Sequence, residues 1–200
     1  MMTDAQWDKL LNIRTSGRDD SHSDRFRYPY EPTPYSVLGR LAGSDYLTKK
    51  NTLLDYGSGK GRVGFFLGYQ MGCRCFGIEA DDRIYAAGLE NLGTAVSSAK
   101  VTFEQADAGY YEVPEAVDRC FFFNPFCVEI LKKTMNRILE SWYDDPREIL
   151  LFFYYPSDEY ISYLMTVPEI VFRDEIDCRD LFKESDARER IMIFELESQV

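Results

Sequence analysis

Short apolar runs alternate with amphipathic segments through most of the chain. The apolar runs are too short for helices, as expected of strands buried on both faces of a parallel sheet. In chain order they are TLLDY, CRCFGIE, KVTFEQAD, DRCFFFNP and EILLFFYY. Helical spacing occupies 60–70, 81–94, 127–142 and 157–165. This alternation predicts a doubly wound, Rossmann-like α/β fold with helices on both faces of a mostly parallel sheet.

Two further apolar runs, EIVFRDEID and RERIMIFELE, lie near the C-terminus. The segment between them is too short for a crossover helix, so we expect a C-terminal antiparallel pair. With this pair the predicted sheet has seven strands. Ligands of such sheets bind at the carboxyl ends of the strands, so the residues at those ends are the candidate site.

The N-terminal quarter of the chain precedes the predicted sheet. A short amphipathic helix is expected near Trp7, followed by a polar, partly mobile stretch up to residue 27. Thr33 and Pro34 form a typical helix start, as N-cap and first helical position, and Gly43 is a typical stop. We predict one domain over 1–200, made of a polar N-terminal segment (1–27), a lid with a first helix (28–50) and a Rossmann-like core (51–200).

The bulk composition excludes several classes of protein. The chain has 200 residues, 45% of them apolar, and a formal net charge of −11, so we expect a folded domain. It lacks the overall positive charge of nucleic-acid binders, which leaves only a local basic groove for such a partner. No apolar run approaches the roughly 20 residues of a membrane span, and the N-terminus does not resemble a secretory signal. We therefore expect a cytoplasmic protein with no membrane partner. Its five cysteines fit reduced thiols, and its single histidine, His22, lies in a polar stretch, which argues against a metal site.

The first predicted strand ends in Asp55 and Tyr56 and continues into a glycine-rich loop, GSGKGRVG. Glycine loops bind phosphates in several nucleotide-binding families. A Walker A loop would need glycine at position 54, where the chain has leucine, and Ser or Thr at position 61, where it has glycine. This class of phosphate site is therefore excluded.

The dinucleotide fingerprint G-x-G-x-x-G is matched literally by Gly59, Gly61 and Gly64. The strand ends earlier, however, and counted from the first loop residue the third glycine falls on Arg62. The carboxylate of Asp55 would also repel a pyrophosphate docked at the start of the helix, and would favour a cationic ligand.

The stretch from Asp55 to Gly61 resembles motif I, D-x-G-x-G-x-G, of the class I S-adenosylmethionine-dependent methyltransferases. Later strand ends agree with that family in order and spacing, namely Glu79, Asp107 and the NPF sequence at 124–126. The resemblance covers roughly residues 30 to 197. It implies the family's Rossmann-like fold and S-adenosyl-L-methionine as the cofactor.

Each strand end has a role under this resemblance. Asp55 would act on the methionine ammonium, Glu79 would accept from two ribose hydroxyls, and Asp107 with Ala108 would hold the adenine. The structural alternatives are a charge at a helix N-terminus for Glu79 and a turn residue for Asp107. The residues predicted to bind the cofactor are Tyr30, Thr33, Asp55, Gly57, Ser58, Gly59, Gly61, Glu79, Ala80, Asp107, Ala108 and Asn124.

Asn124, Pro125 and Phe126 form the predicted catalytic set. They partly resemble the N-P-P-Y/F motif of amino-group methyltransferases, in which the Asn side chain and the first proline carbonyl accept from the acceptor NH2. The second proline of that motif is missing here, and a helix started by a proline is the alternative interpretation. Tyr154 and Tyr155, which end the fifth strand, are predicted to line the acceptor pocket.

Aromatic and basic residues near the predicted site have less specific assignments. Tyr28, Tyr30 and Tyr35 either close over the sulfonium as a lid, since aromatic faces attract cations, or pack the first helix against the core. Lys60 and Arg62 are expected to cap or decorate the helix after motif I rather than to contact an acidic substrate.

The sequence thus predicts a methyltransferase that transfers a methyl group from S-adenosyl-L-methionine to a small molecule or a protein. The short chain leaves no room for a separate substrate-recognition domain. Two alternatives stay open, an NAD(P)-dependent oxidoreductase on a similar sheet and a non-catalytic relative that binds the same nucleoside. The oligomeric state is not assigned.

Overall fold

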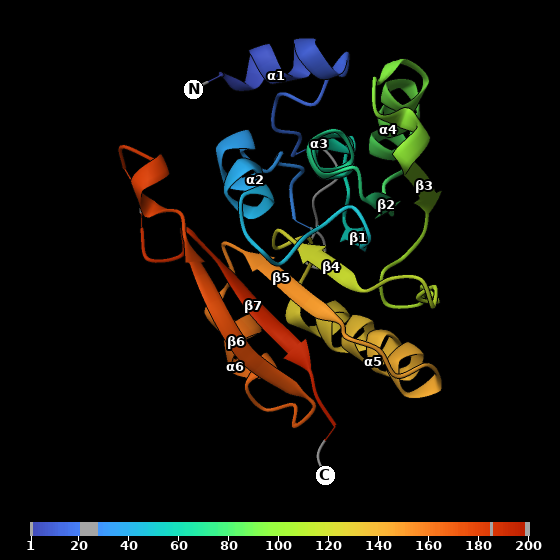
Figure 1. Ribbon diagram of the computed structural model, residues 1–200, viewed down its shortest axis with the longest axis vertical. Helices are drawn as coiled ribbons and strands as arrows, with labels where there is room; N and C mark the ends of the chain where they lie inside the picture. The colour runs from blue at the N-terminus through green and yellow to red at the C-terminus, as the bar shows by residue number, and fades with distance from the viewer. Residues whose placement is uncertain (1, 21–27, 185, 199–200) are drawn as a thin grey trace.

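The computed structural model describes residues 2–20, 28–184 and 186–198, which form one sheet covered by helices on both faces (Figure 1). The strands are β1 (Thr52–Tyr56), β2 (Arg74–Glu79), β3 (Val101–Gln105), β4 (Arg119–Phe122), β5 (Leu150–Tyr154), β6 (Ile170–Asp177) and β7 (Arg190–Leu196). The α-helices are α1 (Asp4–Leu11), α2 (Tyr35–Ala42), α3 (Arg62–Met71), α4 (Asp82–Thr94), α5 (Val128–Asp144) and α6 (Asp158–Leu164). Single 3-10 turns lie at Ser98–Lys100 and Arg179–Leu181. His22 and the stretch 21–27 lie outside the described residues, so the expectations for them stay predictions.

The seven strands are ordered β3-β2-β1-β4-β5-β7-β6. Strands β1 to β5 are parallel, and β7 is antiparallel to both of its neighbours, β5 and β6. The predicted fold class is therefore confirmed, including the antiparallel C-terminal pair. The chain leaves β1 toward β2 on one side and returns to β4 on the other, so the carboxyl ends of β1 and β4 form the switch point where such sheets bind ligands.

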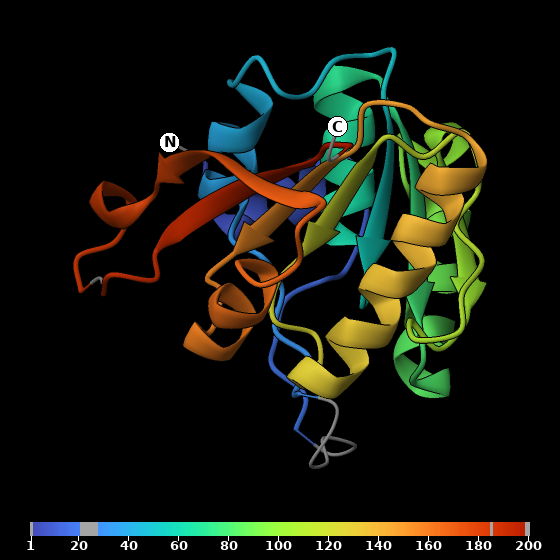
Figure 2. The same ribbon diagram turned by 90° about the horizontal axis from the view of Figure 1, so that it is seen from below.

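Adjacent residues of the central strands belong to two separate hydrophobic cores, one on each face of the sheet. Leu53 of β1 belongs to the core that α1, α2 and α3 cover, whereas Leu54 belongs to the core that α5 and α6 cover. Figure 2 shows α5 along one face of the sheet and α3 along the other. Burial of every residue of β1 and β5 explains why these strands are continuous apolar runs rather than alternating ones.

A stack of aromatic rings crosses the sheet near its carboxyl edge. The rings of Tyr56, Phe122 and Phe153 come from β1, β4 and β5, and each neighbouring pair has centroids 4.6 Å apart. Phe126, just after β4, meets Phe122 edge-on at 6.5 Å. Because aromatic pairs at these distances pack tightly, the stack gives the edge of the sheet a rigid floor.

The start of α2 differs from the prediction. The helix begins at Tyr35, Pro34 takes the N-cap position, and no side chain caps it. The carbonyl oxygen of Thr33 instead accepts a hydrogen bond from Arg62. Tyr35 is buried beside Trp7 and Phe66, so its packing role is confirmed and its lid role is wrong.

None of the helices in the described ranges is long and apolar enough to cross a membrane.

Candidate functional site

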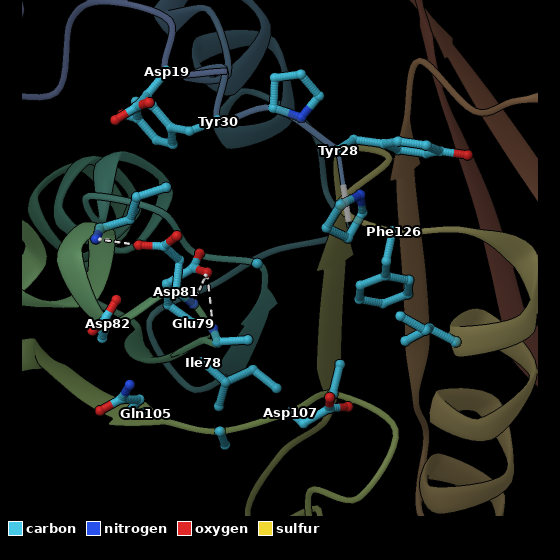
Figure 3. Close-up of a pocket in the computed structure, with 18 of the residues that line it drawn as sticks. Asp19, Tyr28, Tyr30, Ile78, Glu79, Asp81, Asp82, Gln105, Asp107 and Phe126 are labelled. Carbon is cyan, nitrogen blue, oxygen red and sulfur yellow. Dashed lines mark hydrogen bonds between the residues drawn. The ribbon is translucent and has the colours of Figure 1, made fainter. Parts of the chain in front are cut away.

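A cavity of about 510 Å³ opens at the carboxyl edge of the sheet. Its volume is within the range of small-molecule sites. Figure 3 shows Glu79, Asp107, Phe126 and Tyr30 arranged around the open space. The lining residues are Asp19, Tyr28, Pro29, Tyr30, Glu31, Gly57, Ile78, Glu79, Ala80, Asp81, Asp82, Ile84, Gln105, Ala106, Asp107, Ala108, Pro125, Phe126 and Ile130. They come from the N-terminal lid, motif I, the ends of β2, β3 and β4, and the start of α5.

The amide groups of the motif I loop are turned toward β2. The N–H groups of Gly57 and Ser58 both donate to the carbonyl oxygen of Ile78, at 3.0 and 2.9 Å. The N–H of Gly59 donates to Oε2 of Glu79 at 3.0 Å. These bonds fix the loop against the neighbouring strand, and they leave these three amides without a hydrogen to offer a phosphate.

Close approaches explain why glycines are needed in this loop. Gly57 has a φ of 70°, and a Cβ there would lie 2.5 Å from Cβ of Pro125. Gly59 has a φ of 58°, and the ring of Tyr30 occupies the place of its missing side chain. Gly61 caps α3 with a φ of 88° and packs against Phe103. The structure thus places Gly57 and Gly59 near the ligand space, while Gly61 serves the packing of α3.

Asp55 is buried at the end of β1, with only 4% of its surface exposed. Its Oδ2 atom has no hydrogen-bond partner among the described residues. Burial, and to a lesser degree the charge of Glu79, raises the pKa of this carboxyl to about 8. A buried carboxyl without a partner costs free energy in the empty protein, and such groups are found where a ligand supplies the partner.

Asp55 lines a second, smaller chamber of about 30 Å³, beside the main cavity. Ser58 also lines it, and the Oγ atom of Ser58 is buried without a partner in the described part of the chain. Tyr30, Glu31 and Gly57 line both spaces, so they form the wall between them. The chamber is polar and has room for a group of the size of one or two waters.

Glu79 ends β2, and backbone amides hold its carboxylate in place. Oε1 accepts from the N–H of Ala80 at 2.8 Å and of Asp81 at 2.9 Å, while Oε2 accepts from Gly59. Burial raises the pKa of Glu79 above its ordinary value, and these three hydrogen bonds work in the opposite direction. The carboxylate is thereby oriented toward the cavity, with one lone pair of Oε2 left for a hydroxyl donor.

Glu79→Gln is expected to weaken adenosyl binding by about tenfold to a hundredfold. The new NH2 group would face backbone N–H donors, and the side chain would have one acceptor oxygen fewer for the ligand. Isothermal titration with S-adenosylhomocysteine measures the change. The matched control is Glu104→Gln, since Glu104 is exposed on β3 and accepts from the hydroxyl of Tyr111. Equal affinities of the two variants would contradict the role of Glu79.

The end of β3 supplies the far wall of the cavity. Oδ1 of Asp107 accepts from the N–H of Gly109 at 2.9 Å, which is the bond of a turn residue. Asp107 still lines the cavity, together with Gln105 and Ala108. The structural and the ligand-binding interpretations of Asp107 are therefore compatible.

The NPF sequence divides into two parts. Pro125 and Phe126 line the cavity, but Asn124 does not. The side chain of Asn124 instead donates to the carbonyl oxygen of Tyr155 and accepts from the N–H of Ser157. Asn124 and Tyr155 both have positive φ, 39° and 51°, so an amide links two strained positions at neighbouring strand ends.

The aromatic residues proposed for the acceptor pocket lie elsewhere. The hydroxyl of Tyr154 donates to Glu189, and that of Tyr155 donates to Asp186. Neither tyrosine lines the two chambers described above. Tyr28, which is 44% exposed, does line the main cavity.

The surface role expected of Arg62 is wrong. Its side chain is only 3% exposed, because it is directed into the protein toward the N-terminal segment. Lys60 is half-buried, with Nζ 4.7 Å from the centroid of the Tyr30 ring. No local pattern marks Arg62 as buried, since its partners Thr15 and Asp4 lie 47 and 58 positions away along the chain.

Acidic residues of the cavity include several that motif comparison did not identify. Every ionisable acid or base in the lining of the main cavity is a carboxylate, apart from its tyrosines, and the described lining has no Lys, Arg or His. The carboxylates that had not been predicted are Asp19, Glu31, Asp81 and Asp82. Asp81 was detectable, because it caps α4 by accepting from the N–H groups of Arg83 and Ile84. No comparable sequence signal marked Asp19 or Glu31.

Solved structures with the same arrangement settle the type of fold. An RNA methyltransferase from Salinibacter ruber in complex with S-adenosyl-L-homocysteine has a TM-score of 0.58 and 17% identity, over 85% of this chain and 96% of the other. The glycopeptide N-methyltransferase MtfA with S-adenosyl-L-methionine has a TM-score of 0.63 and 11% identity, over 82% and 87%. The chain has the Rossmann-like fold of S-adenosylmethionine-dependent methyltransferases.

The remaining comparisons do not identify the ligand of this fold. A protein of the NADB-Rossmann superfamily from Streptococcus agalactiae has a TM-score of 0.61 and 16% identity, over 86% of this chain and 71% of the other. No model of a protein family and no curated protein matches this sequence. The fold alone therefore leaves both nucleoside and dinucleotide ligands open, and the chemistry of the site has to distinguish them.

Proposed function

We propose that the protein is a methyltransferase that uses S-adenosyl-L-methionine. The observation that carries this proposal is Oδ2 of Asp55, which is buried beside a glycine loop and has no partner within residues 2–20, 28–184 and 186–198. S-Adenosylmethionine carries an ammonium that fits this carboxyl and a sulfonium that fits an acidic cavity, and it has no phosphate. A nicotinamide dinucleotide would instead place a pyrophosphate near Asp55, against loop amides that already donate to Ile78 and Glu79.

The residues of the site fit the parts of this cofactor. Asp55 and Ser58 would hold the methionine ammonium, Glu79 would accept from a ribose hydroxyl, and Asp107 would accept from the adenine amine. S-Adenosylmethionine supplies a methyl group on a positively charged sulfur, and the electron pair of the broken carbon–sulfur bond stays on that sulfur. The protein contributes alignment, since the lone pair of the acceptor must point at the methyl carbon. Any proton that the acceptor loses passes to solvent.

The acceptor is a separate part of the proposal. The net charge of −11 and the acidic lining favour a small molecule or an exposed protein group over nucleic acid. Pro125 and Phe126 lie where the acceptor would meet the cofactor, and we place Asn124 among the groups that hold this loop in position. A cytoplasmic location remains part of the same proposal.

Isothermal titration with S-adenosylmethionine, S-adenosylhomocysteine, NADH and NADPH tests the choice of cofactor. We expect both adenosyl ligands to bind with micromolar dissociation constants and neither nicotinamide to bind measurably. Raising the salt concentration should weaken the binding of S-adenosylmethionine more than that of S-adenosylhomocysteine. Only the former carries a sulfonium, which the carboxylates attract. Binding of a nicotinamide alone would overturn the proposal.

One observation favours a second candidate, a non-catalytic protein that binds the same cofactor. Both polar groups of the NPF sequence that an acceptor NH2 would need already have partners. Oδ1 of Asn124 accepts from the N–H of Ser157, and the carbonyl oxygen of Pro125 accepts from the N–H of Tyr28, both at 3.3 Å. Tight adenosyl binding with no methyl transfer to a broad panel of amines, thiols and carboxylates would support this candidate.

A further inference from the structure

Arg62 follows motif I directly, yet its guanidinium is turned away from the ligand space. Nε donates to Oγ1 of Thr15 at 2.7 Å, and Nη1 donates to Oδ2 of Asp4 at 2.5 Å and to the carbonyl oxygen of Thr33 at 3.2 Å. The guanidinium also lies over the Tyr35 ring, 4.4 Å from its centroid. One buried side chain thus joins the start of α3 to α1, to Thr15 in the turn after α1 and to Thr33 in the lid.

Asp8 of α1 completes this buried cluster. Its carboxylate accepts from the N–H and the hydroxyl of Thr15, at 2.8 and 2.7 Å, and from the hydroxyl of Tyr35 at 2.6 Å. Burial would raise the pKa of Asp8, but these hydrogen bonds and the charge of Arg62, 3.8 Å away, bring it below the ordinary value. A buried network in which each group has partners is rigid.

The cluster reaches the lid through Thr15. The carbonyl oxygen of Thr15 accepts from the hydroxyl of Tyr30 at 2.6 Å. The backbone of Tyr30 pairs with that of Asp19 in both directions, at 3.0 and 3.1 Å. The ring of Tyr30 lies against Gly59 and separates the two chambers of the site. The position of Thr15 therefore sets the position of the lid over motif I.

A second connection runs through α4. Asn91 is buried, its Oδ1 accepts from the N–H of Arg14 at 2.8 Å, and its Nδ2 donates to the carbonyl oxygen of Lys60 at 2.9 Å. Lys60 belongs to motif I. The N-terminal segment is thus attached to the glycine loop from two sides.

Arg62 does not serve as the counter-ion of Asp55. Arg62 lines the small chamber together with Asp55, but its Nε and Nη1 donate to Thr15, Asp4 and Thr33, and its Nη2 lies 3.8 Å from Asp8. The pKa of Asp55 is raised, whereas a nearby guanidinium aimed at it would lower that pKa. The arrangement keeps the positive charge on the N-terminal side and leaves Asp55 for a ligand.

We propose that Arg62 is a positioning residue, which couples the docking of α1 and the Thr15 turn to the closure of Tyr30 over the motif I loop. The N-terminal segment is then part of the binding machinery although α1 does not touch the cavity. The coupling is reciprocal, so a ligand that binds under the closed lid strengthens the docking of α1. The identity of that ligand rests on the proposed function, but the connection between Arg62 and the lid does not.

Arg62→Lys tests the inference, with Arg119→Lys as the matched control. Arg119 is also buried and donates to the carbonyl oxygen of Tyr46 and to Glu148, but it lies at the amino end of β4, away from the cavity. Both variants are expected to lower the melting temperature. Only Arg62→Lys is expected to speed amide hydrogen exchange at Tyr30 in the ligand-free protein, by about tenfold or more, and to weaken S-adenosylhomocysteine binding to a similar degree.

Two milder variants interrupt the same connection farther along. Thr15→Val removes the hydroxyl that Arg62 and Asp8 share, and Tyr30→Phe removes only the hydroxyl that reaches Thr15. Each should reproduce part of the loss of affinity with a smaller loss of stability. These two variants keep the inference testable even if Arg62→Lys does not fold.

Trp7 provides a spectroscopic readout of α1 docking. Its ring lies 4.9 Å from that of Phe66 in α3, and a Trp142→Phe background leaves Trp7 as the single tryptophan of the chain. We expect S-adenosylhomocysteine to shift Trp7 emission and to slow exchange of the α1 amides, and both effects to be reduced in Arg62→Lys.

The outcomes separate the two proposals. Unchanged lid exchange and ligand affinity in Arg62→Lys would overturn the positioning role, as would equal loosening of the lid by Arg119→Lys. If the wild-type protein binds no adenosyl ligand while Arg62→Lys alone loosens the lid, the positioning role stands and the proposed function fails.

Discussion

Asp55→Asn is expected to stabilise the protein and to weaken its affinity for adenosyl ligands. The carboxyl has a pKa of about 8 in the folded protein, against an ordinary value of 3.8. Between these values the folded protein holds a proton that the unfolded chain releases, so the free energy of unfolding falls as the pH rises. Asparagine does not titrate, so the free energy of unfolding of the variant does not fall with pH in this way. At pH 8 the difference from the wild type is on the order of several kcal/mol.

Thermal unfolding at pH 5, 6.5 and 8 measures this effect. The melting temperature of Asp55→Asn should exceed that of the wild type by several degrees at pH 8, and the difference should shrink toward pH 5. Asp45→Asn is the control, because Asp45 is exposed in the loop after α2 and should leave the pH dependence unchanged. A difference that does not vary with pH would show that Asp55 is ionised in the empty protein.

The same substitution is expected to weaken S-adenosylmethionine binding by about a hundredfold, because a ligand ammonium loses a buried carboxylate. In the wild type, binding of that ammonium must release the proton of Asp55. The dissociation constant should therefore fall by up to about tenfold per pH unit between pH 6 and 7.5. Titration in two buffers of different ionisation enthalpy detects the released proton directly.

Gly57→Ala is expected to lower the free energy of unfolding by about 2–5 kcal/mol, since it combines a strained positive φ with overpacking. The added Cβ would lie 2.5 Å from Cβ of Pro125, which cannot move without displacing the loop after β4. Urea denaturation measures the loss. Adenosyl affinity should fall as well, because both residues line the cavity.

A double-mutant cycle tests the cause of this loss. Pro125→Gly removes the obstructing carbon, so in its background Gly57→Ala should cost less than in the wild type. Gly93→Ala is the control, because Gly93 lies in α4 with no atom within 4 Å of the position of its Cβ, and alanine favours helix there. Additive effects at positions 57 and 125 would mean that the contact does not carry the energy.

The sequence predicted the fold and the centre of the site because both depend on local patterns. Continuous apolar runs mark buried parallel strands, and parallel strands deliver Asp55, Glu79 and Asp107 to one edge of the sheet. The register of the glycine loop was also predictable, since β1 ends at Tyr56. These features require no knowledge of contacts between distant residues.

The contributions of the N-terminal segment could not be predicted in the same way. Arg62 and Thr15 are 47 positions apart and become neighbours only when α1 docks. Asn124 matched a catalytic motif by type and place, but its amide is directed to Tyr155, 31 positions away. A motif specifies which residue follows a strand, whereas the partner of its side chain depends on packing that the local sequence does not contain.

The position of β7 in the sheet has a consequence for synthesis of the chain. β7 is the last strand to be made, yet it lies between β5 and β6 and pairs with both. Until residues 190–196 leave the ribosome, β6 has no strand to pair with and β5 presents an open, apolar edge. Open edges of this kind promote association between chains. Completion of the sheet therefore depends on residues 190–196, and a chain interrupted before β7 is expected to aggregate rather than to fold.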